Sequence, residues 1–571
     1  MTSSALSART MRSGIRVLAT LVLLAIASVA FAQTRRARSI SVEFDRLPKN
    51  AKVDVLIRFK SHLDSNKLNA ARSAGGVEKR QLGRFRTFAM KQMPVAAVAA
   101  LAKNPNVEYI TPDRKLKPTM DYASATVGAD LVWSTGFDGT GIGVAVIDSG
   151  IADHPDLRTS AGQSRVVYRE VFTGGGSNDI HGHGTHIAGI IGSSGASSNS
   201  SQHIVKGIAP KVNLVDLHVL GDDGTAEESA ILAAIDRAIQ LKNTYNIRVI
   251  NLSVGRPIYE SYSIDPLCQA VEEAWNAGIV VVVAAGNLGR DNSFENHGYA
   301  TITSPGNSPY VITVGAMSTK TTFSRSDDVI ATYSSKGPSV IDHFLKPDLV
   351  APGNQILSLK SSDTMTLAQQ LPGNAVPMSY FGSNGNNGNS PYFKLSGTSM
   401  ATPVVAGAAA LLLQKYPNLT PDQVKARLMK TARKDFAPSM SATDAATGIT
   451  YTSSHDIFTV GAGYLDVNGA LASTDTSTGS ARSPEVVSDP ITGQASIVMA
   501  NNVIWGTNVI WGTNVIWGTN VIWGTNVIWG TNVIWGTNSA QGYNVIWGTT
   551  ADTAENLTGA LSNPSVGAGE Q

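Results

Sequence analysis

The chain has 571 residues, and its 45 Lys and Arg stand against 43 Asp and Glu, for a formal net charge of +2. This length predicts more than one domain, and the balanced charge argues against nucleic acid or an anionic membrane surface as a partner. The single cysteine, Cys268, excludes an internal disulfide. No nucleophile signature surrounds it, so we expect a buried structural residue.

Residues 1–32 have the organisation of a secretory signal peptide. Arginines at 9, 12 and 16 precede the apolar run 17–31, which ends in the small-residue pattern Ala30-Phe31-Ala32. The run is short for a membrane span, and an uncleaved N-terminal anchor is the alternative. The sequence therefore predicts export.

Residues 33–118 are predicted to form a small α+β domain. Apolar residues alternate along 53–59 as in a strand, residues 94–103 have a helical pattern, and 107–110 are strand-like again. The domain is rich in Lys and Arg. A solvated basic face explains this better than nucleic-acid binding, because no aromatic residues interleave with the basic ones.

Residues 119–474 are predicted to form an α/β domain with a doubly wound parallel sheet and helices on both faces. Continuous apolar runs are typical of strands buried on both faces, and they occur at 142–147, 212–217, 249–253, 279–284 and 310–314. Helical patterns at 227–241 and 269–276 supply crossovers. Thr420-Pro421-Asp422-Gln423 predicts the N-terminus of a further helix, with a capping box. The Gly- and Asn-rich stretch 371–390 predicts a long surface loop.

The C-terminal part divides into a predicted linker (475–501), a repeat segment (502–549) and a tail (550–571). The hexapeptide Asn-Val-Ile-Trp-Gly-Thr occurs six times in tandem from residue 502 and once more at 544–549, and it contains seven of the nine tryptophans. An even period would place Val, Trp and Thr on one face of a strand. We expect strand ladders, a solenoid or pairing with other chains, and a disordered tail is the alternative.

One serine lies where a nucleophile is useful. The small-residue turn Ser396-Gly397-Thr398-Ser399 leads directly into the apolar helical segment 404–414. The hydroxyl of Ser399 therefore lies at a helix N-terminus, which favours developing negative charge. Catalysis would also need a base, an orienting carboxylate and oxyanion donors.

Candidates for these groups lie upstream. His181, His183 and His186 fall within six residues, and Asp148 ends a predicted buried strand, where sites in doubly wound sheets form. Zinc is the alternative for the histidines. It is disfavoured because no Glu follows the helical metalloprotease spacing and no cysteine is near.

Three segments resemble the signature segments of subtilisin-like serine peptidases, in that family's Asp, His, Ser order. They are Ile147-Asp148-Ser149-Gly150, residues 182–189 and residues 397–403. The resemblance covers about residues 121–472 and extends to Ala284-Ala285-Gly286-Asn287, 333–338 and 346–353. It implies a subtilisin-like fold and serine endopeptidase activity.

The resemblance also implies roles. Ser399 would attack the scissile carbonyl and form an acyl-enzyme, His183 would transfer the proton, and Asp148 would orient the imidazole. Asn287 and the backbone N–H of Ser399 would stabilise the oxyanion, a turn residue being the alternative for Asn287. His181 and His186 are expected to be structural.

The family edge that binds an extended substrate backbone has its counterpart in Ser253-Val254-Gly255, with Ala285 and Gly286. This implies broad specificity for protein or peptide substrates. Arg256 stands where the family often has a small residue, which leaves the pocket preference open.

The chemistry implied by the family needs no cofactor, but its members frequently bind calcium. Asp156 matches a ligand position, and calcium is therefore the candidate cation there. The loop 192–206 is rich in serine and offers no carboxylate for a hard cation.

Secreted members of the family carry a propeptide that inhibits the enzyme intramolecularly until it is removed, and residues 33–118 match such a domain in size. Cleavage is then expected around 117–121.

We therefore predict a secreted, self-processing serine endopeptidase whose repeat tail self-associates or attaches to the cell surface. The alternatives are a surface or assembly protein with an incidental peptidase fold, and an enzyme for acyl transfer or esterolysis.

Overall fold

The structure is a computed structural model. It describes residues 40, 41, 44, 48 and 51–498. Within the range 51–498, the residues that it does not describe are 114, 119–123, 199–202, 294–295, 323–324, 382–387, 437–438, 445–447 and 489–494. The predicted signal peptide, the repeats and the part of the cleavage region beyond Pro118 lie outside the described residues. None of the helices described combines the length and apolarity that a membrane span requires.

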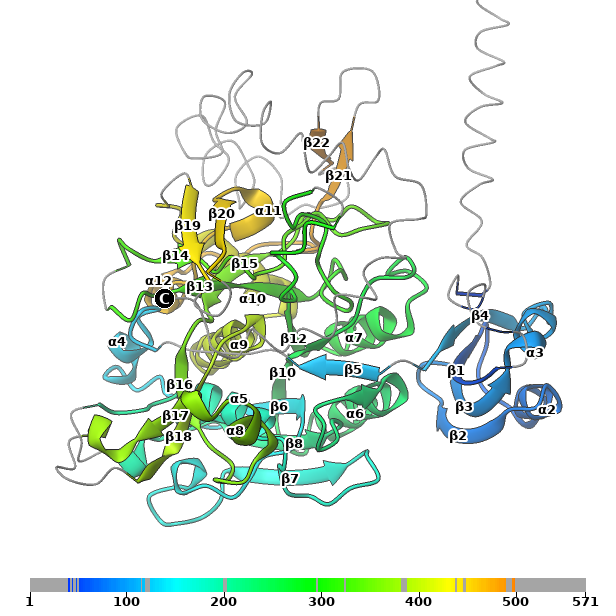
Figure 1. Cartoon of the computed structure of the whole chain (residues 1–571), viewed down its shortest axis with the longest axis horizontal. Coiled ribbons are helices and arrows are strands. Elements are labelled where there is room, and N and C mark those ends of the chain that lie inside the picture. Colours follow the sequence, from blue (N-terminus) through cyan, green and yellow to red (C-terminus); the bar gives the residue numbers. More distant parts are fainter. Residues whose placement is uncertain are drawn as a thin grey trace, which may run out of the picture.

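A small N-terminal domain lies at one end of the molecule (Figure 1). Its antiparallel sheet has the order β2-β3-β1-β4. The elements are β1 (Lys52–Phe59), α2 (Ser65–Ser73), β2 (Val77–Leu82), β3 (Thr87–Pro94), α3 (Val95–Leu101) and β4 (Val107–Pro112). The predicted strand, helix and strand are confirmed as β1, α3 and β4. The prediction omitted α2, β2 and β3, and β2 in particular is mostly polar and only partly buried, so its apolar pattern is weak.

The large domain contains the predicted parallel sheet. Its order is β14-β13-β12-β10-β6-β8-β7, with β15 also paired to β13. Among the described strands of this sheet, the β13–β14 pair is antiparallel and the other pairs are parallel. The strands are β6 (Gly143–Asp148), β7 (Val166–Val171), β8 (Asn213–His218), β10 (Ile247–Leu252), β12 (Val280–Ala284), β13 (Ile312–Ser318), β14 (Val329–Ile330) and β15 (Leu349–Pro352). Strands β6 and β12 are buried along their whole length, as their continuous apolar sequences predict.

Helices cover both faces of this sheet (Figure 1). On one face lie α5 (His183–Gly192) and α9 (Thr398–Lys415), and on the other lie α6 (Glu228–Leu241) and α7 (Pro266–Asn276). Cys268 is buried in α7, as expected. Helix α10 (Pro421–Thr431) begins with the predicted capping box between Thr420 and Gln423. The predicted doubly wound α/β fold is confirmed.

Two segments differ from the prediction. The stretch 371–390 is not entirely a loop, because β17 (Ala375–Pro377) pairs with β18 (Asn389–Leu395), which in turn pairs with β16 (Ile356–Leu359). Part of the predicted linker packs on the large domain, since Ala481, Ser483 and Val486 are buried. Short segments that pair with distant strands have no strong pattern of their own.

Candidate active site

Asp148 and His183 lie in contact at the carboxyl end of the sheet. Asp148 is the last residue of β6, and His183 is the first residue of α5. Asp148 Oδ1 lies 2.5 Å from His183 Nδ1, and both side chains are buried. A Cβ atom on Gly184 would lie 2.2 Å from the carbonyl oxygen of Gly150, so glycine at 184 is needed for α5 to approach the turn after β6 this closely.

A buried carboxylate, Asp179, holds the start of α5. Its oxygens accept hydrogen bonds from the backbone N–H groups of Gly182 (2.7 Å) and Thr185 (2.8 Å) and from the hydroxyl of Ser149 (2.8 Å). Ser149 Oγ accepts in turn from the N–H of Gly184 (2.8 Å). Burial raises the pKa of Asp179 to about 6. Asp179 is not among the predicted site residues, although an Asp shortly before a helix is a capping signal.

Ser399 is the second residue of α9. Its hydroxyl donates to the carbonyl of Ser253 (3.0 Å), and Ser253 Oγ donates to the carbonyl of Ser399 (2.9 Å). The second bond compensates for a gap in the helix. The carbonyl of Ser399 would normally accept from the N–H of residue 403, but that residue is Pro403, which has none. Ser253 thus supplies the missing donor.

Asn287 follows β12 and faces the same helix start. Its Oδ1 accepts hydrogen bonds from the N–H (2.9 Å) and the hydroxyl (3.1 Å) of Thr398, the residue before Ser399. Its Nδ2 is buried and has no hydrogen-bond partner among the described residues. Because two donors hold the amide oxygen, the amide nitrogen is left as a fixed, unused donor. Nothing in the sequence indicates that Thr398 holds the amide oxygen of Asn287 in this way.

The neighbouring histidines are packed into the fold. His181 and His186 are buried, and His186 Nε2 lies 3.1 Å from the carbonyl oxygen of Phe393. Burial lowers the pKa of His181 to about 4 and that of His186 to about 3, so both are neutral near pH 7.

Of the described residues, only Asp54, Asp113 and Glu227 form a group of three potential metal ligands, and Lys79 forms ion pairs with all three.

The two predicted substrate-binding segments meet around Thr303. A Cβ on Gly255 would lie 2.5 Å from Thr303 Oγ1, and a Cβ on Gly286 would lie 2.8 Å from Thr303 Cγ2. Gly286 also has φ +106°, a conformation that favours glycine. Thr303 donates its backbone N–H to the carbonyl of Ala285 (3.0 Å). Thr303 lies in a loop, so no periodic pattern or motif in the sequence predicts its contact with these two segments.

Arg256 forms a buried ion-pair cluster. Its Nη2 lies 2.8 Å from Asp265 Oδ2, 3.2 Å from Glu228 Oε1 and 3.3 Å from Glu260 Oε1. Its backbone N–H donates to the carbonyl of Ser304 (3.0 Å). These contacts occupy the guanidinium and explain how an arginine is accommodated at this position.

Strand β5 (Lys115–Pro118) extends from the N-terminal domain into the large domain (Figure 1). It pairs antiparallel with β11 (Val254–Gly255) on one side and with β9 (Ala226–Glu227) on the other. Pro118 pairs with Val254, and Lys117 with Gly255. The chain's own strand thus lies along the predicted substrate-binding edge.

The two domains also contact each other through side chains. Leu82 and Phe85 join the apolar core of the large domain. Asp113 accepts from the N–H of Ser229 in the first turn of α6 (2.7 Å), and Arg84 forms an ion pair with Asp236 on the same helix (2.6 Å).

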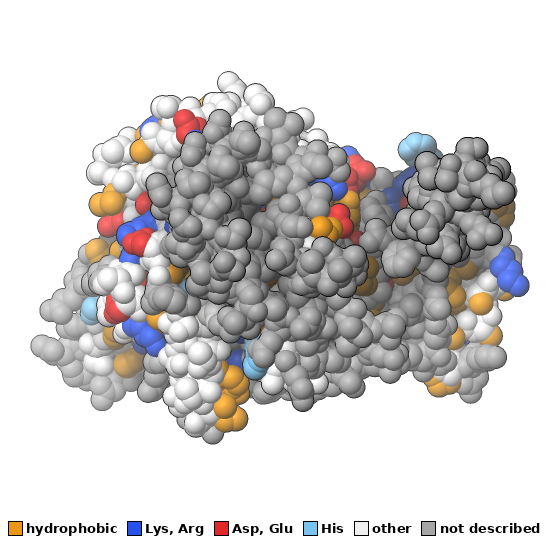
Figure 2. Space-filling model, turned by 90° about the horizontal axis from the view of Figure 1, so that it is seen from above, with side chains coloured by type: hydrophobic (Ala, Val, Ile, Leu, Met, Phe, Trp, Pro, Cys, Tyr) orange, Lys and Arg blue, Asp and Glu red, His pale blue; other side chains and the backbone are white. Residues whose placement is uncertain are grey.

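On the described part of the face in Figure 2, acidic and basic side chains lie interspersed.

Comparison with known proteins identifies the family. The profile of the Subtilase family matches residues 139–461, more than half of the chain. The chain belongs to the subtilase family. It is therefore a subtilisin-like serine protease, as its signature segments predicted.

Two subtilases illustrate the likeness. The chain is 37% identical to the serine protease AprX of Bacillus subtilis (strain 168) over 393 residues, which make up 66% of this chain and 83% of AprX. It is 34% identical to subtilisin E of the same strain over 362 residues, 63% of this chain and 78% of that protein.

A solved structure shares the fold. Fervidolysin from Fervidobacterium pennivorans, a keratinolytic enzyme related to subtilisin, matches with a TM-score of 0.54 at 21% identity. The match covers 78% of this chain and 64% of fervidolysin, just under two thirds of that protein.

Proposed function

We propose that this subtilase is a secreted endopeptidase that cleaves proteins or peptides through Asp148, His183 and Ser399. Ser399 Oγ attacks the scissile carbonyl to form an acyl-enzyme, and His183 accepts its proton and then delivers it to the leaving amine. Asp148 accepts from His183 Nδ1–H, which orients the ring and stabilises the imidazolium. Export is supported by the signal-like sequence of residues 1–32.

The observation that carries this proposal is the orientation of Asn287. Because Thr398 holds its Oδ1, its buried Nδ2 remains available to a ligand beside Ser399. With the backbone N–H of Ser399, this donor would bind the oxyanion of the tetrahedral intermediate. Neither step uses a metal or an organic cofactor.

Residues 33–118 are proposed to be an inhibitory propeptide that the enzyme removes itself. The pairing of β5 with β11 and β9 supports this, because an extended substrate would bind the same two edges. In this arrangement Ser253, Val254 and Gly255 bind the substrate backbone, and Ala285 and Gly286 also contact the substrate. Cleavage is expected within 117–121.

The Ser399→Ala variant tests this function. We expect the variant, expressed without other proteases, to keep its N-terminal domain and to leave casein intact. Mass spectrometry of the termini of secreted wild-type and variant protein would locate both cleavages. Full processing of the variant in isolation would contradict self-cleavage, and casein hydrolysis by it would contradict the role of Ser399.

The repeat segment is proposed to attach the enzyme to the cell surface or to other copies of the chain. Deleting residues 502–549 should leave peptide hydrolysis unchanged while releasing the enzyme from the surface or from assemblies. Equal retention and assembly after the deletion would refute this role. Esterolysis remains open to the same triad, and the ratio of ester to peptide turnover measures it.

A further inference from the structure

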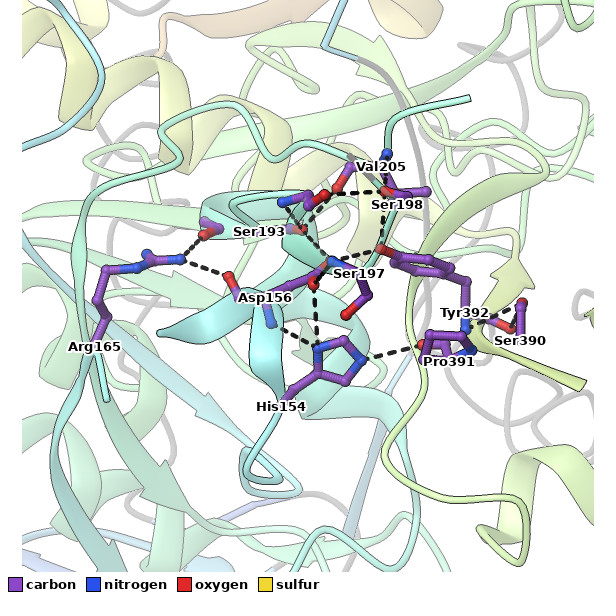
Figure 3. Close-up of polar contacts among 12 residues, drawn as sticks. His154, Asp156, Arg165, Ser193, Ser197, Ser198, Val205, Ser390, Pro391 and Tyr392 are labelled. Carbon is purple, nitrogen blue, oxygen red and sulfur yellow. Dashed lines mark hydrogen bonds and ion pairs between the residues drawn. The ribbon is translucent and has the colours of Figure 1, made fainter. Parts of the chain in front are cut away.

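Asp156 is buried in the short 3-10 helix η2 (Pro155–Leu157), and hydrogen-bond donors surround its carboxylate (Figure 3). Oδ1 accepts from the N–H of Ser197 (2.7 Å). Oδ2 accepts from the hydroxyl of Tyr392 (2.7 Å), and Ser193 Oγ lies 3.1 Å from Oδ2 and 2.7 Å from the carbonyl oxygen of Val205, to which its one proton is directed. Donors from two distant parts of the chain therefore meet on one carboxylate.

A guanidinium occupies the other side of this site (Figure 3). Arg165 is buried and donates to the backbone carbonyls of Asp156 (2.8 Å), Val212 (3.0 Å) and Gly192. Three carbonyl oxygens around one positive charge resemble the environment that a protein offers to a metal ion. Here the positive charge belongs to a side chain.

These residues do not fit calcium. Ca²⁺ needs about six to eight oxygen ligands at roughly 2.3–2.6 Å. Both oxygens of Asp156 already accept N–H or O–H groups, and the carbonyls of Asp156 and Gly192 accept from Arg165. In the described part of the loop 192–206, Ser193 and Ser198 turn their hydroxyls to partners within the protein.

The site joins three segments that are far apart in sequence. Helix η2 follows β6, which ends at Asp148, Ser193 follows α5, which begins at His183, and Tyr392 lies in β18, shortly before Ser399. Tyr392 also packs against Phe381, with ring centroids 5.1 Å apart. The contacts therefore hold together the three segments adjoining the proposed triad.

We propose that Asp156, Tyr392 and Arg165 form a metal-free latch that takes the place of a bound cation in holding these segments together. Asp156 serves as the acceptor for the loop and for β18, and Arg165 supplies the positive charge that binds the carbonyls. Burial and the nearby carboxylate raise the pKa of Tyr392, so its hydroxyl remains a donor at all ordinary pH values. Because the contacts of the latch involve no cation, we expect its stability to be independent of calcium.

The test uses the full-length chain with Ser399→Ala, which is chosen to prevent self-digestion, and measures thermal unfolding and calcium binding. The readouts do not depend on catalysis, so they stand even if the proposed function fails. We expect the same Tm in excess chelator and in millimolar CaCl₂. Tyr392→Phe should lower Tm by about 1.5–4 °C, because a buried acceptor loses its donor in a domain of about 350 residues, and calcium should not restore it.

Tyr245→Phe is the matched control. It also removes one tyrosine hydroxyl, and Tyr245 contacts Tyr168 by its ring. We expect this change to leave Tm within about 1 °C. Limited proteolysis should cut the loop 193–206 faster in Tyr392→Phe than in Tyr245→Phe.

Asp156→Asn separates this site from any other calcium site. If calcium raises the Tm of the parent and of Asp156→Asn equally, the ion binds elsewhere and the latch proposal stands. If calcium raises the Tm of the parent and the shift disappears in Asp156→Asn, Asp156 is a calcium ligand and the proposal is wrong. An unchanged Tm in Tyr392→Phe would also overturn it.

Discussion

Replacing Asn287 tests the proposed oxyanion site most directly. Asn287→Ala removes the Nδ2 donor, but it also removes the Oδ1 acceptor used by the N–H and hydroxyl of Thr398. Asn287→Asp is the matched variant, because a carboxylate can still accept from Thr398 while offering no donor. The pair therefore separates catalysis from local stability.

The expected magnitudes differ for the two effects. Loss of one oxyanion donor in subtilisin lowers kcat by about 10²–10³, equivalent to about 2.7–4 kcal/mol of transition-state stabilisation, and we expect that range here. Loss of the two Thr398 bonds should cost Asn287→Ala about 1–3 kcal/mol of folding stability. Asn287→Asp should lose at least as much kcat, because its charge repels the oxyanion, and should lose less stability.

The assay is steady-state hydrolysis of a chromogenic peptide by matured enzyme, normalised by active-site titration, with urea unfolding alongside. Variants that process slowly can be matured by wild-type enzyme bound to a resin, which is removed before the assay. We expect kcat to fall and KM to change little. A decrease in kcat of less than about five-fold in both variants, or a change confined to KM, would refute the role of Asn287.

Three further predictions concern one hydrogen bond of the site, one buried lysine and the segment after residue 474. Ser253→Ala should lower the free energy of unfolding in urea by about 1–3 kcal/mol, because the carbonyl of Ser399 loses the donor that replaces the N–H missing at Pro403. Ser253→Thr keeps a hydroxyl and should retain most of the stability. Equal stability of the two variants would argue against this role of the Ser253 hydroxyl. Burial lowers the pKa of Lys336 from 10.5 to about 8, so the unfolded state binds more protons between these values and stability should rise with pH across that window. Lys336→Met should make this rise smaller without abolishing it, because burial also lowers the pKa of Lys346 and of Lys434 to about 7. An identical pH profile for the variant would contradict the assignment. A chain ending at residue 488 should melt higher than one ending at residue 474, because the segment between them buries Ala481, Ser483 and Val486; equal melting temperatures would show that this packing contributes nothing.

The prediction succeeded where the pattern is local. Strand β12 is a run of apolar residues because both of its faces are covered, so its sequence alone indicates its place in the sheet. The capping box of α10 lies within four residues and is readable for the same reason. The motif around Ser399 places a hydroxyl at a helix start, which requires only a turn followed by a helix.

Other features depend on contacts between distant segments. The segment 371–390 contains many Gly and Asn residues, yet part of it becomes β17 because β18 offers it a pairing edge. Asp156 matches a calcium ligand position in sequence, but Tyr392 and Arg165 reach it from other parts of the chain and occupy its surroundings. No local sequence pattern indicates these partners, because they meet Asp156 only in the folded chain.

The sequence by itself therefore determined the α/β fold, the family and the candidate triad, because each follows from short-range periodicity or from contiguous motifs. Only the tertiary structure decided how Thr398 orients Asn287, how Ser253 replaces the donor missing at Pro403, and which groups surround Asp156. Each of these features depends on hydrogen bonds between segments that are far apart in sequence. The partners of Asn287 and of Ser253 lie more than a hundred residues away, and Tyr392 lies more than two hundred residues from Asp156. Such geometry exists only once the sheet and helices have packed.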